Sequence, residues 1–303
     1  MQSKKILIAV VGPTAVGKTE ISIKIANHLS AEIISADSRQ FYRELEIGTA
    51  KPDATELSQA VHHLINSLSI HDDYDVRDFE NEALTIIEAY FKDHNAMVMV
   101  GGSGLFVNAL AYGLDELPEV KEGMREKLIA EVETKGIFKL QEELKVNDPE
   151  YYAIVDLNNP QRVMRALEVI RSTGKPFSSF RTGGKVERPF QLIWIGLEME
   201  REVLYKRIDL RMDQMIGNGL FEEAQQFYPE RDLNALQTVG YKEIFGYLDG
   251  GYDKEEAIRL LKRNSRRYAK RQMTWFRKNE EITWFNPNDL QKILNHIEKE
   301  IKA

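Results

Sequence analysis

Short apolar runs alternate with stretches of helical periodicity along the first third of the chain. Three of these runs, at Ile6–Val11, Glu32–Ser35 and Ala96–Val100, are bounded by loop-forming residues and have the length of buried strands. Apolar residues at helical spacing follow each run, which is the alternation expected of an α/β fold with a parallel sheet. The helices predicted in this part are Thr19–Leu29, Phe79–Phe91 and Gly104–Tyr112.

The alternation stops at Leu114–Pro118. After this break the pattern is helical only as far as Thr173, and Arg181–Arg188, with two glycines and alternating charges, indicates an irregular return. Phe190–Leu197 then has the character of a further buried strand and resumes the sheet. The predicted domains are an all-helical insertion at residues 115–185 and a core made of residues 1–114 and 186–303. Helices are predicted in the insertion at Met124–Lys135, Phe138–Lys145, Pro149–Val155 and Gln161–Arg171, and after it at Arg201–Phe227, Thr238–Leu248 and Lys254–Arg277, before a short strand near Ile282–Phe285 and a terminal helix.

The segment between the first predicted strand and helix reads GPTAVGKT and fits the phosphate-loop pattern G-x-x-x-x-G-K-[ST]. Its two glycines permit a tight path with inward amide hydrogens, and the helix that follows adds the positive end of its dipole. Lys18 supplies a cation for terminal phosphates, and Thr19 offers a hydroxyl to Mg²⁺. A P-loop NTPase-like core that binds a diphosphate or triphosphate is therefore predicted. The residues of this loop are Gly12, Pro13, Thr14, Ala15, Val16, Gly17, Lys18 and Thr19.

The usual aspartate at the end of a second buried strand is missing, because Ala96–Val100 runs into two glycines. The carboxylate at a strand end is Asp37 instead. In a doubly wound sheet the carboxyl ends of the strands face the ligand crevice, so Asp37 is expected near the phosphate loop. It could act there as a general base or a Mg²⁺ ligand, or it could cap a turn with Ser38. Its location favours the functional role.

Charge is distributed unevenly along the chain. The net charge is −7, yet the stretch from Arg259 to Lys278 carries nine lysines and arginines and no acid. Local potential, rather than total charge, decides what a surface attracts. This block is therefore either a nucleic-acid-binding face or a solvated helix surface.

Composition excludes several classes of site. There is no cysteine among the 303 residues, so disulfides and thiolate metal sites are excluded, and a cytoplasmic location is expected. No apolar run approaches the roughly 20 residues that span a bilayer. His62, His63 and His71 have no further ligand at regular spacing, so no metal site is predicted there.

Six motifs in order carry a resemblance to a known family. They are GPTAVGKT, ISADSRQFYRELEIGTAKP, VGGSGLFVNAL, NNPQRVMRALEVIRSTGKP, VGYKE and KRQMTWFRK. Together they cover Ile6 to Lys278, and the chain resembles the tRNA dimethylallyltransferases of the bacterial type. The resemblance implies transfer of a dimethylallyl group from dimethylallyl diphosphate to N6 of the adenosine 3′ of the anticodon, in tRNAs that read codons beginning with U. It also implies Mg²⁺ as cofactor.

The resemblance carries site residues with it. It implies catalytic roles for Lys18, Thr19, Asp37 and Ser103, with Thr19 on the Mg²⁺ and Asp37 as general base. Ser103 stands where threonine is usual and Phe106 where tyrosine is common. The residues implied for tRNA contact are Asp37, Ser38, Arg39, Gln40, Ser103, Arg125, Gln161, Arg162, Val163, Met164, Arg165, Gln237, Thr238, Val239, Gly240, Tyr241, Lys242, Lys270, Arg271, Gln272, Trp275 and Arg277.

Three other functions share the phosphate loop. An ATP-dependent small-molecule kinase would not need the helical insertion or the acid-free basic block. An adenylate isopentenyltransferase acting on free nucleotides would have little use for either. A non-enzymatic RNA-binding NTPase switch would leave Asp37 without a role. No exposed dimer face is evident, so a monomer is expected, with tRNA and dimethylallyl diphosphate as its partners.

Overall fold

The core of the protein is a six-stranded, all-parallel sheet. We describe residues 4–302 of a computed structural model, in which the strands lie in the order β3-β2-β4-β1-β5-β6. The central strand β1 pairs in parallel with β4 and β5 along its whole length, and its residues are all buried. The strands are β1 (Ile6–Val11), β2 (Ile33–Ser35), β3 (His62–His63), β4 (Ala96–Gly101), β5 (Gln191–Leu197) and β6 (Thr283–Phe285). The predicted α/β class is confirmed.

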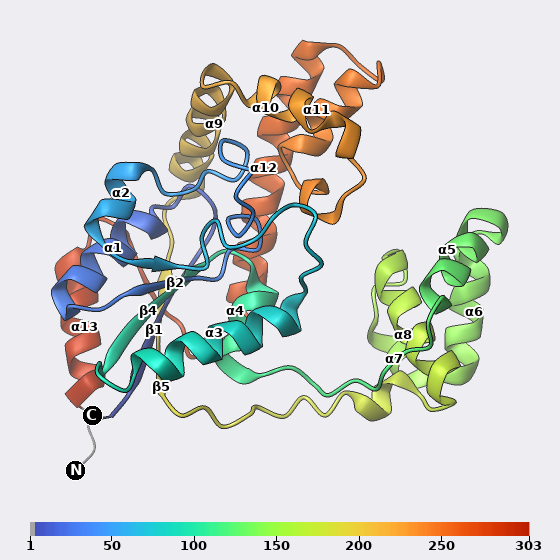
Figure 1. Ribbon diagram of the computed structural model, residues 1–303, viewed down its shortest axis with the longest axis horizontal. Helices are drawn as coiled ribbons and strands as arrows, with labels where there is room; N and C mark the ends of the chain where they lie inside the picture. Colours follow the sequence, from blue (N-terminus) through green and yellow to red (C-terminus); the bar gives the residue numbers. More distant parts are fainter. Residues whose placement is uncertain (1–3, 303) are drawn as a thin grey trace. The chain divides into compact units, whose positions relative to one another are not determined.

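Helices cover both faces of this sheet (Figure 1). Ile6, Ile8 and Val10 of β1 point into one apolar cluster with buried residues of α1, α9 and α13. Leu7 and Ala9 alternate to the other face, where they are equally buried. α3 and α4 pack against each other there through aromatic rings. The helices around the sheet are α1 (Lys18–Leu29), α2 (Ala54–Gln59), α3 (Val76–Tyr90), α4 (Gly104–Tyr112), α9 (Arg201–Gly217), α10 (Leu220–Gln226), α11 (Tyr241–Leu248), α12 (Lys254–Phe276) and α13 (Leu290–Lys302).

Two predictions about elements were wrong. A single helix was expected over Arg201–Phe227, but α9 and α10 are separate because Gly219 takes a φ of 102°, a region that favours glycine. No strand was predicted around His62, but this segment pairs with β2 as the short edge strand β3. β3 has only two residues, too few for a pattern of alternation to be visible in the sequence.

α9 to α12 enclose a second apolar cluster, which holds Met212, Phe221, Phe227 and Tyr241. Glu223 of α10 fastens the loop after Tyr42 to this cluster, because its carboxylate accepts the amides of residues 46, 47 and 48 at 3.1, 2.8 and 2.8 Å. The same carboxylate accepts the Tyr241 hydroxyl at 2.6 Å.

The residues from Tyr112 to Glu187 form a compact unit of their own. Its limits differ by two or three residues from the predicted 115 and 185. The unit contains only helices and irregular segments, and Leu128, Leu140, Leu144, Leu167 and Phe177 are among the residues that form its core. Its helices are α5 (Met124–Lys135), α6 (Ile137–Asn147), α7 (Pro149–Ile154) and α8 (Pro160–Thr173).

Arg188 lies in the larger unit, directly after the chain returns from the helical one. Its guanidinium donates to the carbonyls of Ala109 and Leu110, at 2.6 and 3.0 Å, where the chain leaves the larger unit. It also pairs with Glu80 of α3 at 2.5 Å, and both side chains are more than nine-tenths buried. Arg188 thereby joins the segment that leaves the larger unit to the segment that returns to it.

Candidate active site

Glycine is required at both ends of the phosphate loop. At Gly12 the φ is 146°, and a Cβ would stand 2.5 Å from the carbonyl oxygen of Leu197 on β5. At Gly17, which caps α1, the φ is 104°. The loop therefore turns tightly into the start of α1, where free amides and the helix dipole favour an anion. The predicted phosphate cradle has the expected strand–loop–helix context.

Lys18 is held inside this loop. Its ammonium donates to the Pro13 carbonyl at 2.9 Å. Burial lowers the pKa of Lys18 from 10.5 to about 8, the negative charge of Asp37 acts to raise it, and the positive charge of Arg211 lowers it further. A partly desolvated lysine at the end of a phosphate loop stabilises an anion placed beside it more strongly than an exposed lysine would.

Arg211 of α9 is a second cation at the same site, and the sequence interpretation missed it. Its guanidinium donates to the Thr14 hydroxyl at 3.3 Å and to the Ala50 carbonyl at 3.5 Å. Burial lowers its pKa, whereas the charge of Asp37 raises it. Arg207, one helical turn earlier, donates to the Ala15 carbonyl at 2.9 Å. Two arginines four residues apart on the helix that follows a sheet strand were the signal available in the sequence.

Asp37 lies directly after β2, at the carboxyl edge of the sheet, as predicted. Its Oδ1 accepts the Arg39 amide at 3.1 Å, so it also caps the turn that follows. Its charge acts on Lys18, Arg211 and Tyr268, which converge on this edge from α1, α9 and α12. Asp37 thus caps the turn and also faces two cations, and its role as general base or Mg²⁺ ligand stays a prediction.

Ser103 holds the turn beside Asp37. Its hydroxyl accepts the Ser38 amide at 3.1 Å and lies 3.1 Å from the Ser38 hydroxyl. The phenol of Tyr268 on α12 also bonds to Ser103, while burial and the charge of Asp37 raise the pKa of Tyr268 to about 12. Tyr268 therefore stays neutral at physiological pH and acts as a hydrogen-bonding group. Phe106 packs against Phe41 at 5.7 Å between ring centroids, in an apolar setting.

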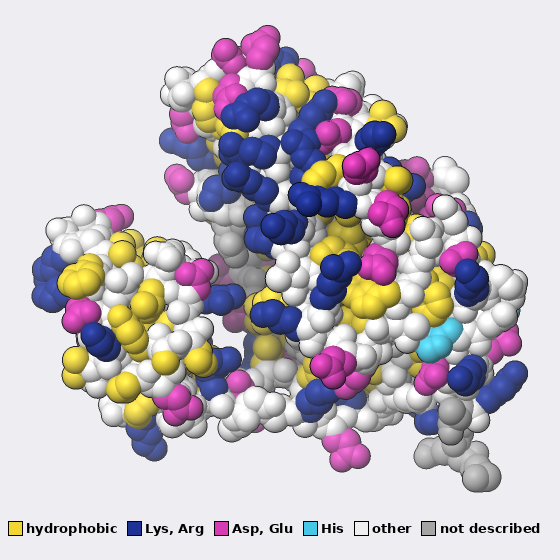
Figure 2. Space-filling model, turned by 180° about the vertical axis from the view of Figure 1, so that it is seen from behind, with side chains coloured by type: hydrophobic (Ala, Val, Ile, Leu, Met, Phe, Trp, Pro, Cys, Tyr) yellow, Lys and Arg dark blue, Asp and Glu magenta, His cyan; other side chains and the backbone are white. Residues whose placement is uncertain are grey.

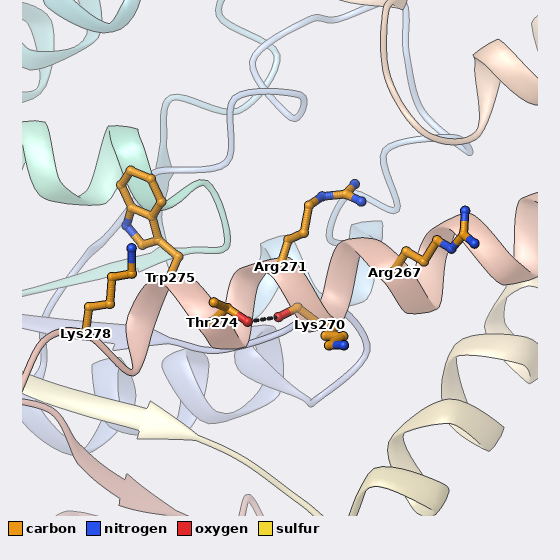
Figure 3. A pocket seen from close by; sticks show the side chains of 6 residues that line it. All are labelled: Arg267, Lys270, Arg271, Thr274, Trp275 and Lys278. Atoms are coloured by element: carbon orange, nitrogen blue, oxygen red, sulfur yellow. Dashed lines mark hydrogen bonds between the residues drawn. The ribbon is translucent and has the colours of Figure 1, made fainter. Parts of the chain in front are cut away.

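The predicted basic block contains residues that pair with acids and residues that line an acid-free hollow. Lys262 and Arg266 pair with Asp213 and Asp209 of α9 and hold the two helices together. On another side of α12 a hollow of about 460 Å³ has no acidic side chain in its lining. Figure 2 shows lysines and arginines gathered over this part of the larger unit, and in Figure 3 Arg267, Arg271 and Trp275 project from one side of the helix. The residues that line the hollow are Arg267, Lys270, Arg271, Thr274, Trp275 and Lys278.

Some residues implied for tRNA contact have no side chain at the surface. Val163 and Met164 are in the core of the helical unit, and Tyr241 is in the core beneath Glu223. Gly240 and Gln272 are also buried. Their side chains are therefore not available for contact at the surface, because a motif spans both faces of a helix and only one face is outward. Phe276, the neighbour of Trp275 in the sequence, is 1% exposed and belongs to the core.

The outward residues of the same motifs remain candidates. Gln161, Arg162, Gln237, Lys242, Lys270, Arg271 and Arg277 are exposed, and Arg39, Gln40, Arg165, Thr238, Val239 and Trp275 are partly so. In the helical unit, Arg125 donates to Glu168 at 2.7 Å and also to Gln161. Arg165 donates to the other oxygen of Glu168 at 3.0 Å. Glu168 is 2% exposed, so one buried carboxylate fixes two surface arginines.

Protein atoms supply only some of the ligands that a magnesium ion would need at this site. No group of three or more His, Cys, Asp or Glu side chains that could hold a metal occurs among residues 4–302. Hard oxygen ligands are available from the Thr19 hydroxyl and the Asp37 carboxylate. Mg²⁺ in such sites keeps waters and binds substrate phosphates, which a sparse protein donor set allows.

Comparison with known proteins identifies the family. The family model described as IPP transferase matches residues 40–279. The chain belongs to the IPP transferase family. It is 53% identical to the tRNA dimethylallyltransferase of Christiangramia forsetii, over 98% of this chain and 99% of that one, and 50% identical to that of Cytophaga hutchinsonii, over 98% of each.

Solved structures agree with this membership. The tRNA isopentenylpyrophosphate transferase of Bacillus halodurans is 42% identical, with a TM-score of 0.73 and coverage of 99% of this chain and 97% of that one. A eukaryotic dimethylallyltransferase acting on tRNA is 26% identical, with a TM-score of 0.80 over 99% of this chain and 78% of that one. The chain is therefore a prenyl-transferring enzyme, and the kinase and switch alternatives have no support. None of the helices among the described residues is long and apolar enough to cross a membrane.

Proposed function

We propose that this transferase moves a dimethylallyl group from dimethylallyl diphosphate to N6 of the adenosine 3′ of the anticodon, in tRNAs that read codons beginning with U. The observation that carries the proposal is the meeting of Lys18, Arg211 and Asp37 at one edge of the sheet. Two desolvated cations beside a phosphate loop suit a diphosphate leaving group, and a carboxylate opposite them suits removal of a proton.

In the proposed step, N6 of the adenosine attacks C1 of the dimethylallyl group. The N6–C1 bond forms, the C1–O bond breaks, and the diphosphate leaves with the bonding electron pair. Negative charge develops on the departing oxygen, where the loop amides, Lys18 and Arg211 stabilise it. The proton from N6 passes to Asp37. An allylic carbon tolerates a loose, carbocation-like transition state, so the reaction needs no covalent nucleophile.

A bound Mg²⁺ would supply further charge neutralisation of the diphosphate. Thr19, in the first turn of α1, would contribute its hydroxyl to this ion. We assign Asp37 to the proton and not to this ion, because a carboxylate bound to Mg²⁺ would be a weaker base.

Recognition of tRNA would use two sets of cations. The acid-free hollow on α12 offers Arg267, Lys270 and Arg271 to backbone phosphates, and its Trp275 offers an aromatic face for a base. In the helical unit, Arg125 and Arg165 offer a pair of guanidinium groups. An adenine stacked in a loop cannot bring its amine to the phosphate site, so the base would have to leave its stack. Such a reaction belongs in the cytoplasm, and a monomer would suffice for it.

The test uses labelled dimethylallyl diphosphate, Mg²⁺ and an anticodon stem-loop with adenosine in the target place. Two acceptors serve as controls: the same stem-loop with guanosine in that place, and free AMP. Label is expected on the adenosine stem-loop alone. Equal transfer to AMP would support an adenylate isopentenyltransferase instead, and no transfer to either would refute the proposal.

A further inference from the structure

Gln272 occupies a place at odds with its predicted contact to tRNA. It lies on α12 one turn after Tyr268, but its side chain is 6% exposed. Its neighbours Arg271 and Trp275 line the outer hollow, whereas Gln272 faces the loops at the carboxyl edge of the sheet. The helix thus presents cations on one side and a neutral carboxamide on the other.

The carboxamide of Gln272 joins two loops of the site. Its Oε1 accepts the Thr14 amide, in the phosphate loop, at 2.8 Å. Its Nε2 donates to the Gly102 carbonyl, after β4, at 2.9 Å. Because β1 and β4 are neighbours in the sheet, this one side chain spans the gap between the loops that follow them. Arg211 holds the hydroxyl of the same Thr14, so the residue is fixed from two directions.

The carboxamide also lies close to Lys18. A Cβ built on Gly102 would stand 2.3 Å from Nε2 of Gln272 and 3.5 Å from the Lys18 ammonium. A side chain at position 102 would displace the carboxamide of Gln272, so the missing Cβ of Gly102 leaves room for both groups. Any charge placed at position 272 would act directly on this lysine.

Only a neutral group with both a donor and an acceptor satisfies these partners. A glutamine carboxamide has both, whereas a carboxylate only accepts and would repel the Gly102 carbonyl. A carboxylate would also pair with Lys18 and compete with an incoming diphosphate. An apolar side chain would leave the Thr14 amide and the Gly102 carbonyl unsatisfied.

We infer that Gln272 is a positioning residue of the diphosphate site: it sets the spacing between the phosphate loop and the Gly101–Gly102 turn. In this arrangement Lys18 and the loop amides face the diphosphate together. The inference rests on the proposed function for the identity of the diphosphate ester. The inference assigns Gln272 to the phosphate site and not to the RNA-binding surface.

The experiment measures binding of inorganic diphosphate with Mg²⁺, by calorimetry, and the KM for a stem-loop RNA in the transfer reaction. Three variants are compared: Gln272→Met, Gln272→Glu and, on the outer side of the same helix, Lys270→Ala. Gln272→Met is expected to weaken diphosphate binding about tenfold, the usual effect of leaving buried polar groups unsatisfied. Gln272→Glu is expected to weaken it further. Lys270→Ala is expected to raise the KM for RNA and to leave diphosphate binding at the wild-type level.

The split between diphosphate affinity and the KM for RNA separates positioning from a loss of folding. Both Gln272 variants should lose affinity for diphosphate and keep a KM for RNA close to that of the wild type. Urea melts of both variants report the folded fraction, and each affinity refers to that fraction.

Wild-type diphosphate affinity in both Gln272 variants, together with a raised KM for RNA, would overturn the inference and return Gln272 to the RNA surface. Failure of the proposed function gives a different result. Wild-type protein would then bind diphosphate but prenylate no RNA, and the effect of Gln272 on diphosphate binding would still be measured. Wild-type protein that bound no diphosphate would refute both.

Discussion

At the scale of single residues, Asp37 is proposed to take the proton from N6. Asp37→Asn keeps the shape of the side chain and its acceptor for the Arg39 amide, but removes the base. We expect the rate of the chemical step to fall by about 10² or more, the scale of a general base, with RNA affinity close to that of the wild type. Single-turnover transfer to a stem-loop RNA measures the rate. An unchanged rate would remove Asp37 from the chemistry.

Lys18 gives a prediction about pH. Because its pKa is lowered to about 8, the free protein loses this positive charge near pH 8 and not near 10.5. Affinity for diphosphate should therefore be full below pH about 7 and should fall as the pH rises through 8. The Lys18→Arg variant stays charged across this range. It is the matched control, because the ionisation of the diphosphate itself affects both proteins equally. Identical pH profiles for the two proteins would contradict the lowered pKa.

Which residues meet at the site depends on tertiary contacts that no local pattern encodes. The phosphate loop and Asp37 were predictable, since a motif and a strand end mark them. Arg211 and Tyr268 were missed, because each belongs to a helix whose inward face is set by the fold. Gln272 was assigned to RNA because the resemblance gave this role to its whole motif, and a motif does not show which of its side chains face inward.

At the scale of elements, α12 is expected to bind RNA with one side only. Replacing Arg267, Lys270 and Arg271 by alanine should lower stem-loop affinity and reduce the salt slope of log K by about 2 to 3. The control replaces Lys262 and Arg266, whose partners are on α9, and should change the slope little. Fluorescence anisotropy with labelled RNA at increasing KCl measures both. A wild-type slope in the triple variant would show that the hollow does not hold phosphates.

Element boundaries show where sequence patterns are informative. The insertion helices and the long α12 were predicted within a few residues because their apolar periodicity is long and regular. The break between α9 and α10 was missed, because apolar spacing continues across Gly219 and only its backbone conformation ends the helix. The buried Val163 and Met164 illustrate the same limit: the motif was recognised, but not which of its faces is inward.

At the scale of the whole molecule, the division into a sheet and a helical insertion followed from one change of periodicity. The alternation of strands and helices stops after α4 and resumes at β5. The order of the strands could not be read from the sequence, because parallel strands are joined by crossovers that do not specify their neighbours. In the structure β4 lies between β1 and β2, so the Gly101–Gly102 turn lies between the phosphate loop and Asp37.

The buried pair of Arg188 and Glu80 joins the two points where the chain passes between its units. The stability of the larger unit should therefore depend on both residues. Glu80→Gln leaves the guanidinium of Arg188 without its charge partner, and loss of one member of a buried pair costs about 3 to 5 kcal/mol. Arg188→Met leaves the carboxylate of Glu80 buried with Arg77, at 3.5 Å, as its remaining cation, and should therefore cost less.

The double variant Glu80→Gln/Arg188→Met removes both charges, so its loss should be smaller than the sum of the two single losses. The exposed ion pair of Lys24 and Glu20 on α1 is the control. Glu20→Gln should change the free energy of unfolding by less than about 1 kcal/mol. Urea denaturation followed by tryptophan fluorescence measures the free energy of unfolding. Additive losses in the double variant would show that the two charges act independently.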